Sequence, residues 1–205
     1  MIMPGLCKIE GFVKITDPVS GDVLVDKKNA IHYENLSIAM AQSLSDRTLA
    51  QGAGYIYQMA FGNGGSAVDP TGVITYLPPN TTGQNADLYN ETYAKVVDDN
   101  SAADTDPIYN KMTVLHTAGN YYTDILVTCL LDYGEPAGQQ AFDNSTNFNG
   151  EYVFDELGLQ CVHTSLTDLR LITHVIFHPV QKSLNRQIQI DYTLRIQTLT
   201  NLSAA

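Results

Sequence analysis

The sequence predicts a mainly β protein: an antiparallel, jelly-roll-like β-sandwich with one amphipathic helix and a long polar loop insertion. Residues 187–197 alternate strictly between polar and apolar side chains, and this period of two indicates a half-buried strand. A strand with one solvated face is typical of an antiparallel sheet. The spacing of a helix occurs once, near residues 33–46, and the composition becomes polar over residues 66–110. We expect the 205 residues to form a single domain, because a chain of this length can bury a sufficient core.

Two β-like runs near the start of the chain, residues 7–16 and 22–26, flank a predicted turn at residues 17–22. Proline presets one turn dihedral and glycine supplies a positive φ, so this region predicts a hairpin. The helix follows, because apolar residues recur at spacings of three and four over residues 33–46. We expect its apolar face to pack on the sheet, and that face consists of Tyr33, Leu36, Met40 and Leu44.

Further β patterns cover most of the chain outside the polar stretch. Residues 55–61 predict a strand that runs into a glycine turn at residues 62–65. Pro179 should mark a strand end or an edge, since proline cannot donate to a β ladder. The other predicted strands span residues 111–116, 123–131, 152–162, 171–178 and 187–197.

The polar stretch over residues 66–110 is rich in Asn, Thr, Asp, Gly and Pro. Loops of this length are unusual in compact domains and tend to be functional, so we expect this one to contact a neighbouring protein. The alternative is that the stretch is disordered in the isolated protein. Residues 88–97 within it are compatible with a strand or a short helix. The candidate contact residues are Pro78, Pro79, Asp98, Asp99, Asp104 and Asp106.

The composition narrows the classes of partner and the compartment. The formal net charge is -11, from 22 acidic and 11 basic residues, and no basic cluster stands out. Direct binding to nucleic acid or to an anionic membrane is therefore disfavoured. Three widely spaced cysteines, Cys7, Cys129 and Cys161, predict reduced thiols and synthesis in a cytoplasm. We recognise neither a signal peptide nor an apolar run of the roughly 20 residues that a membrane span needs.

Two groups of side chains have the chemistry of metal ligands. Cys161, His163, His174 and His178 occupy alternating positions on two predicted strands and would suit zinc if the strands were neighbours. Their spacing matches no metal-binding pattern, and histidines on strands more often pack or form hydrogen bonds. The carboxylates of residues 98–106 could bind calcium, but their spacing differs from that of an EF-hand loop, and a solvated loop explains them better. We therefore predict no metal and no cofactor.

No pattern in the sequence indicates an active site. The glycines of residues 62–65 precede no Gly-Lys-Ser/Thr motif, so they predict a turn rather than a nucleotide site. A Gly-x-Ser-x-Gly motif is also missing. Asp155 and Glu156 are adjacent on a predicted strand and should point to opposite faces, which argues against an acid/base pair. A carboxylate facing inward would need a partner such as Arg170 or Arg195. We therefore predict that the protein is not an enzyme and has no catalytic residues.

Four segments carry a resemblance to a known group of proteins. They are residues 28–37, residues 59–65 with Phe-Gly-Asn-Gly-Gly, residues 154–159 with Phe-Asp-Glu-Leu-Gly-Leu, and residues 174–182. Together, and in this order, they resemble virion structural proteins of tailed bacteriophages, including tail-fibre and baseplate-associated components. In those proteins a segment similar to residues 154–159 often closes a β-sandwich, with Asn in place of Asp155 and Ile in place of Leu157. The resemblance implies a virion part made in a host cytoplasm and no enzymatic activity.

Three functions are compatible with these observations. The first is a tail or neck adaptor, or a fibre-attachment ring subunit, in a symmetric homo-oligomer with contacts to other virion proteins of the tail, neck, portal or fibre. The second is a capsid decoration or cement protein. The third is a hydrolase or binding module for surface glycans. For the first function, the polar face of residues 187–197 adds three interface candidates: Gln187, Gln189 and Arg195.

Overall fold

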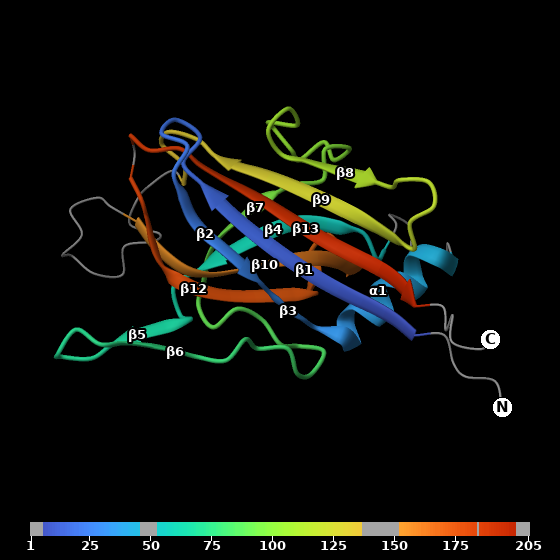
Figure 1. Ribbon diagram of the computed structural model, residues 1–205, viewed down its shortest axis with the longest axis horizontal. Helices are drawn as coiled ribbons and strands as arrows, with labels where there is room; N and C mark the ends of the chain where they lie inside the picture. Colours follow the sequence, from blue (N-terminus) through green and yellow to red (C-terminus); the bar gives the residue numbers. More distant parts are fainter. Residues whose placement is uncertain (1–5, 46–52, 137–151, 184, 200–205) are drawn as a thin grey trace.

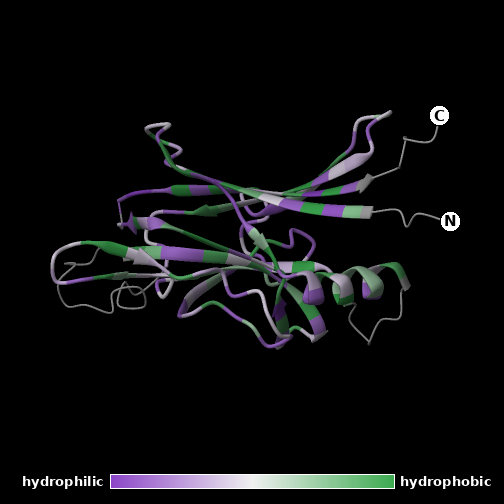
Figure 2. Ribbon diagram, turned by 60° about the horizontal axis from the view of Figure 1, so that its bottom comes forward, coloured by the Kyte–Doolittle hydropathy of each residue, from purple (hydrophilic) through white to green (hydrophobic). Residues whose placement is uncertain are grey.

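A computed structural model describes residues 6–45, 53–136, 152–183 and 185–199 of the chain. Two antiparallel sheets pack face to face, and one short helix lies at one end of them (Figure 1). The two layers are separate when the molecule is seen along the sheets (Figure 2). The predicted mainly β sandwich with a single helix is therefore confirmed. Within the described ranges, no helix is long and apolar enough to cross a membrane.

The first sheet has five strands and joins the two ends of the described chain. Its first strand pairs with its last along the full length, with Leu6 opposite Leu199. The predicted hairpin at residues 17–22 connects the first two strands. In spatial order the strands are β2 (Val23–Lys28), β1 (Leu6–Thr16), β13 (Ile188–Leu199), β9 (Tyr122–Leu131) and β8 (Lys111–Leu115).

The second sheet is built around the long strand β10. Strand β10 pairs with β12 and, further along, with the short strand β11 on one side, and with β4 on the other. A separate two-stranded ribbon, β5 (Ser66–Val68) with β6 (Ile74–Tyr76), projects away from both sheets (Figure 1). The strands of the second sheet are β3 (Ala30–Ile31), β12 (Thr173–Lys182), β10 (Tyr152–Ser165), β4 (Ile56–Gly62), β7 (Glu91–Val96) and β11 (Asp168–Leu171).

Pro179 lies inside β12 rather than at a strand end. Strand β3 pairs with β12 only at Thr173 and His174, so β12 is an edge where the proline stands. The ladder between β12 and β10 is also irregular there, since the register shifts between Phe154 and Glu156. A residue at an edge or a bulge does not have to donate its backbone N–H to a neighbouring strand. A proline, which has no N–H, therefore fits within the strand.

One hydrophobic core fills the space between the sheets, and both sheets contribute to it. Phe154 lies at its centre, edge-to-face with Phe61 at 5.6 Å and with Phe177 at 5.9 Å between ring centroids. The alternation predicted for residues 187–197 is present, because Ile188, Ile190, Tyr192 and Leu194 of β13 are buried in this core.

The helix α1 (Tyr33–Ser45) forms where the spacing predicts it, but it buries a different face. Leu36 and Ala39 are buried and Met40 packs against the core. Tyr33 is 63% exposed and Leu44 is 85% exposed, so the predicted face is wrong at both ends. The reason is position, because the helix lies at one end of the sandwich (Figure 1) and its middle turns make the core contacts.

The polar stretch over residues 66–110 contains more regular structure than a loop. It holds the ribbon β5–β6 and the strand β7, which confirms a strand within residues 88–97. Strand β7 pairs with β4 at the edge of the second sheet. Residues 77–90, between the ribbon and β7, pass over the outer face of that sheet, where they meet the network described below.

Candidate functional site

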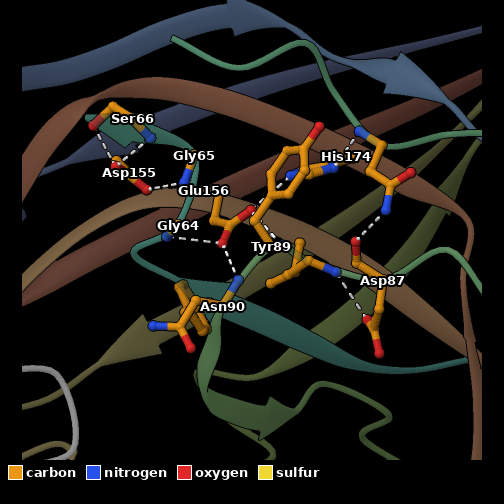
Figure 3. Close-up of polar contacts among 12 residues, drawn as sticks. Gly64, Gly65, Ser66, Asp87, Tyr89, Asn90, Asp155, Glu156 and His174 are labelled. Carbon is orange, nitrogen blue, oxygen red and sulfur yellow. Dashed lines mark hydrogen bonds and ion pairs between the residues drawn. The ribbon is translucent and has the colours of Figure 1, made fainter. Parts of the chain in front are cut away.

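Two adjacent carboxylates of β10 lie on the outer face of the second sheet, where the ladder between β10 and β12 is irregular (Figure 3). Phe154 and Leu157 both belong to the core between the sheets, so the two residues between them share the opposite face. Asp155 is 3% exposed and Glu156 is fully buried. The prediction that they point to opposite faces is wrong, because the irregular ladder at this point interrupts the alternation of the strand.

Glu156 accepts hydrogen bonds from two segments of the chain that lie far apart in sequence (Figure 3). Its Oε1 accepts from the amide of Gly64 at 3.0 Å and from that of Asn90 at 2.8 Å. Its Oε2 accepts from the amide of Tyr89 at 3.0 Å and lies 3.0 Å from Nε2 of His174. Both side chains of this last pair are fully buried.

Asp155 holds the start of the ribbon in the same way. Its Oδ1 accepts from the amide of Gly65 at 2.9 Å, and its Oδ2 accepts from the amide of Ser66 at 2.8 Å and from the Ser66 hydroxyl. The predicted arginine partners are wrong, because Arg170 pairs with Asp168 and Arg195 pairs with Asp124. Backbone amides supply the partners instead, so the buried carboxylates need no basic side chain.

The glycines of residues 62–65 allow this close approach. A Cβ on Gly62 would lie 2.5 Å from the carbonyl oxygen of Asn90 and 2.6 Å from Oε1 of Glu156. A Cβ on Gly64 would lie 2.8 Å from the amide nitrogen of Asn90. None of the glycines in this segment has a positive φ, so space rather than backbone conformation explains the residue type. The amides of Gly64 and Gly65 already serve the protein's own carboxylates.

The two carboxylates differ in their acidity. Burial raises the pKa of Asp155 above its usual value, and the hydrogen bonds from Ser66 and Gly65 offset this only in part. Burial also acts to raise the pKa of Glu156, but the contact with His174 and the three amide donors outweigh it and bring the pKa below its usual value. Hydrogen bonds to a carboxylate favour its charged form, so Glu156 is the better satisfied of the two.

Residues 80–90 are held against the second sheet by further contacts to this network. The amide of Asn80 donates to Nδ1 of His174 at 2.8 Å, and its side chain donates to the carbonyl of Asp87 at 3.1 Å. Gln160 of β10 donates to Oδ1 of Asp87 at 3.2 Å. Near the start of α1, the ring nitrogen Nε2 of His32 lies 2.9 Å from the carbonyl oxygen of Gly83. The polar stretch is therefore fastened to its own sheet along these residues.

The four segments on which the predicted resemblance depends lie at this network or beside it. Residues 28–37 contribute His32, residues 59–65 contribute Gly64, residues 154–159 contribute both carboxylates, and residues 174–182 contribute His174. Sequence reasoning did not predict this meeting. Two features of the sequence could have indicated it: an Asp-Glu pair within an apolar strand, and a glycine-rich segment without charged side chains.

The structure does not bring the four candidate zinc ligands together. Cys161 is part of the core between the sheets, where burial raises its pKa to about 12. His174 lies on the opposite face of the second sheet, and Nδ1 of His178 lies 3.1 Å from the hydroxyl of Tyr76. Within the described ranges, no group of three or more His, Cys, Asp or Glu side chains could hold a metal ion.

The acidic candidates of the polar stretch form local turns. Asp98 is buried and its Oδ1 accepts from the amide of Asn100 at 3.1 Å, while Oδ1 of Asp104 accepts from the amide of Asp106 at 2.9 Å. Asp99 lies between these turns and is partly exposed. Such bonds order a loop from within, as is typical of Asp in turns.

The proline candidates lie beside the buried network. Pro78 and Pro79 are exposed, and the carbonyl of Pro78 accepts from the Tyr89 hydroxyl at 2.7 Å. They follow the ribbon directly in the chain. These two residues are therefore exposed to solvent. They lie between the ribbon and residues 80–90, on the side of the molecule where the second sheet is covered.

The remaining candidates belong to the outer face of the first sheet. Arg195 makes two hydrogen bonds to Asp124, each of 2.7 Å, and its guanidinium lies 4.0 Å from the centre of the Tyr122 ring. Gln187 donates to Asp132 at 2.6 Å, and Gln189 donates to Asp191 at 2.9 Å. All three candidates thus contact neighbours in their own chain and stay partly exposed.

Charges alternate across this outer face. In one row Lys14 stands between Asp26 of β2 and Asp191 of β13, and Lys111 of β8 closes the row beyond Thr128. A second row runs through Glu10, Arg195 and Asp124. Among the described residues, no helix or strand covers this face (Figure 2). Cross-strand pairs of opposite charge stabilise a sheet and leave a polar surface.

Comparison with known proteins gives no relative for this chain. No protein-family model, no curated protein and no solved structure matches it. The resemblance of the four segments to phage virion proteins therefore stays a prediction.

Proposed function

We propose that the protein is a non-enzymatic structural component of a tailed-phage virion, made in the host cytoplasm. Its role is that of a tail or neck adaptor, or of a fibre-attachment ring subunit. It assembles as a symmetric homo-oligomer and contacts other virion proteins of the tail, neck, portal or fibre. The observation that carries this proposal is the open outer face of the first sheet, which presents rows of alternating charge without cover from the described chain.

The distribution of polar groups supports an assembly role. The fully buried carboxylate of Glu156 accepts hydrogen bonds from three backbone amides and contacts His174, so it holds the fold together rather than facing a substrate. The exposed polar groups, by contrast, lie in rows on a broad sheet face. Interfaces between folded proteins have a polar rim and are enriched in Tyr and Arg, and this face presents Arg195 over the Tyr122 ring.

Quantitative mass spectrometry of purified particles tests the role. The phage that encodes the chain should carry it in a fixed copy number, and a small multiple of the ring symmetry places it in the tail or neck. Hundreds of copies per particle would instead indicate the second function, a capsid decoration protein. Particles that lack the chain altogether would refute a virion role.

A further inference from the structure

The ribbon β5–β6, residues 66–76, is an arm whose base contacts β12, where the Tyr76 hydroxyl lies 3.1 Å from Nδ1 of His178, and whose tip projects beyond the sandwich (Figure 1). Its side chains are unusually exposed for apolar residues: Val68 is 63% exposed, Val73 is 56% exposed and Tyr76 is 49% exposed. Asp69 is the one charged residue between positions 64 and 80. An exposed apolar segment of this kind marks a contact surface.

The arm is ordered at both of its ends. At its base, Asp155 accepts hydrogen bonds from Gly65 and Ser66. At its tip, Oδ1 of Asp69 accepts from the amides of Thr71 at 2.8 Å and Val73 at 3.0 Å. A segment that is already ordered loses less conformational entropy when it binds. The buried carboxylate of the second sheet therefore prepares the arm for a partner.

The β8 edge is a second apolar surface on a different part of the molecule (Figure 1). Strand β8 ends the first sheet, and among the described strands it pairs with β9 alone. Lys111 is the one formally charged residue between positions 107 and 117. An open strand edge presents unpaired backbone groups that another strand can join. The exposed apolar residues at this edge are Ile108, 72% exposed, Tyr109, 53%, Val114, 69%, Leu115, 49%, and the nearby Tyr121, 59%.

We infer that the arm of one copy of the chain binds the β8 edge of the next copy. Both surfaces are apolar, and each carries a single charge of opposite sign, Asp69 on the arm and Lys111 on the edge. Elsewhere the copies repel each other, since each has a net charge of -11. Because the arm and the edge are different surfaces, the contact is head-to-tail, and repetition of such a contact closes a ring when the rotation permits. The inference rests on the proposed role as an assembly subunit.

The test compares three lysine substitutions by native mass spectrometry and light scattering. Val73→Lys alters the arm, Leu115→Lys alters the edge, and Val19→Lys is the matched control, at a residue that is 70% exposed in the turn between β1 and β2. Wild type and the control should form the same oligomer. The arm and edge variants should each associate about tenfold more weakly or stay monomeric. Circular dichroism checks that each variant is folded.

Mixing the variants tests the head-to-tail arrangement. Each variant keeps one intact surface, so an equal mixture of the arm and edge variants should form dimers that contain one copy of each and grow no further. Dimers of the arm variant alone would indicate twofold pairing of β8 edges and overturn the inference. A wild-type chain that stays monomeric at its highest soluble concentration would overturn it too.

The copy number of the chain in phage particles distinguishes a failure of the arm contact from a failure of the proposed function. If the arm variant enters particles at wild-type copy number, the arm contact is wrong and the virion role stands. If wild-type particles contain no copy of the chain, the virion role is wrong whatever the purified protein does.

Discussion

The two outer faces of the sandwich differ in what covers them. The outer face of the second sheet lies beneath residues 80–90, which Glu156, His174 and their neighbours hold in place. The outer face of the first sheet carries rows of charged residues and has no cover among the described elements (Figure 2). Polar residues on the second sheet thus hold a covering loop in place, whereas those on the first sheet form an open surface.

The difference shows that burial changes how much a carboxylate contributes to the stability of the fold. Glu156 is fully buried and depends on donors from distant loops, so the loss of its charge should disturb the fold. Asp124 pairs with Arg195 at the surface, where solvent weakens the interaction. The following substitutions compare the two faces, beginning with the largest expected effect.

Glu156→Gln should lower the free energy of unfolding by about 3–5 kcal/mol, because the amides of Gly64, Tyr89 and Asn90 lose a charged acceptor inside the protein. Chemical denaturation monitored by circular dichroism measures the change. Glu34→Gln on the exposed side of α1 is the matched control and should have little effect. Equal stabilities for the two variants would show that the network does not stabilise the fold.

Gly62→Ala should lower the free energy of unfolding by about 3 kcal/mol, because the new Cβ would lie 2.5 Å from a backbone oxygen that cannot move easily. The control is Gly72→Ala in the tip of the arm, where φ is +86° and no atom lies within 4 Å of the new Cβ. It should cost about 1 kcal/mol through backbone strain alone. A smaller loss for Gly62→Ala than for the control would contradict the close packing.

Lowering the pH should reduce the difference in the free energy of unfolding between the wild type and Glu156→Gln. The pKa of Glu156 in the folded protein lies below its unfolded value of 4.5, so its contribution is complete above that pH and is lost as the pH falls through the folded pKa. The change cannot exceed about 1.4 kcal/mol per pH unit for a single proton. Thermal unfolding at several pH values below 5 measures it, and a constant gap would be the contrary result.

Arg195→Ala on the open face should cost at most about 1 kcal/mol, because the pair with Asp124 is partly exposed to solvent. The loss should shrink at high salt, which screens exposed charges. Lys111→Ala at the end of the neighbouring row serves as the control and should change stability by less than about 0.5 kcal/mol. A loss as large as that of Glu156→Gln would mean that the two faces do not differ as we argue.

Much of the fold could be predicted from local patterns. The alternation over residues 187–197, the turn at residues 17–22 and the helical spacing over residues 33–46 correspond to β13, the β1–β2 hairpin and α1. These patterns are reliable because side-chain direction depends on the backbone conformation of a few neighbouring residues. The buried face of α1 was predicted less well, since it depends on where the helix meets the sandwich.

The candidate site could not be predicted in the same way. Alternation alone assigns Asp155 and Glu156 to opposite faces, whereas both lie on the outer face where the β10–β12 ladder is irregular. This arrangement is stable because donors arrive from positions 64–66 and 89–90, more than sixty residues away in sequence. No local pattern contains that information. The interface candidates of the polar stretch and of β13 stay predictions.

The sequence by itself determined the sandwich class, the order of its main strands and the single helix, because these follow from periodic burial and from turn residues. The tertiary structure alone decided which polar residues are buried. It brought residues 64–66, residues 89–90 and His174 to one carboxylate pair, and no other described element covers the arm, the β8 edge or the face of the first sheet. The physical reason is that a buried charge is stable only where several donors converge, and convergence is a property of the folded chain.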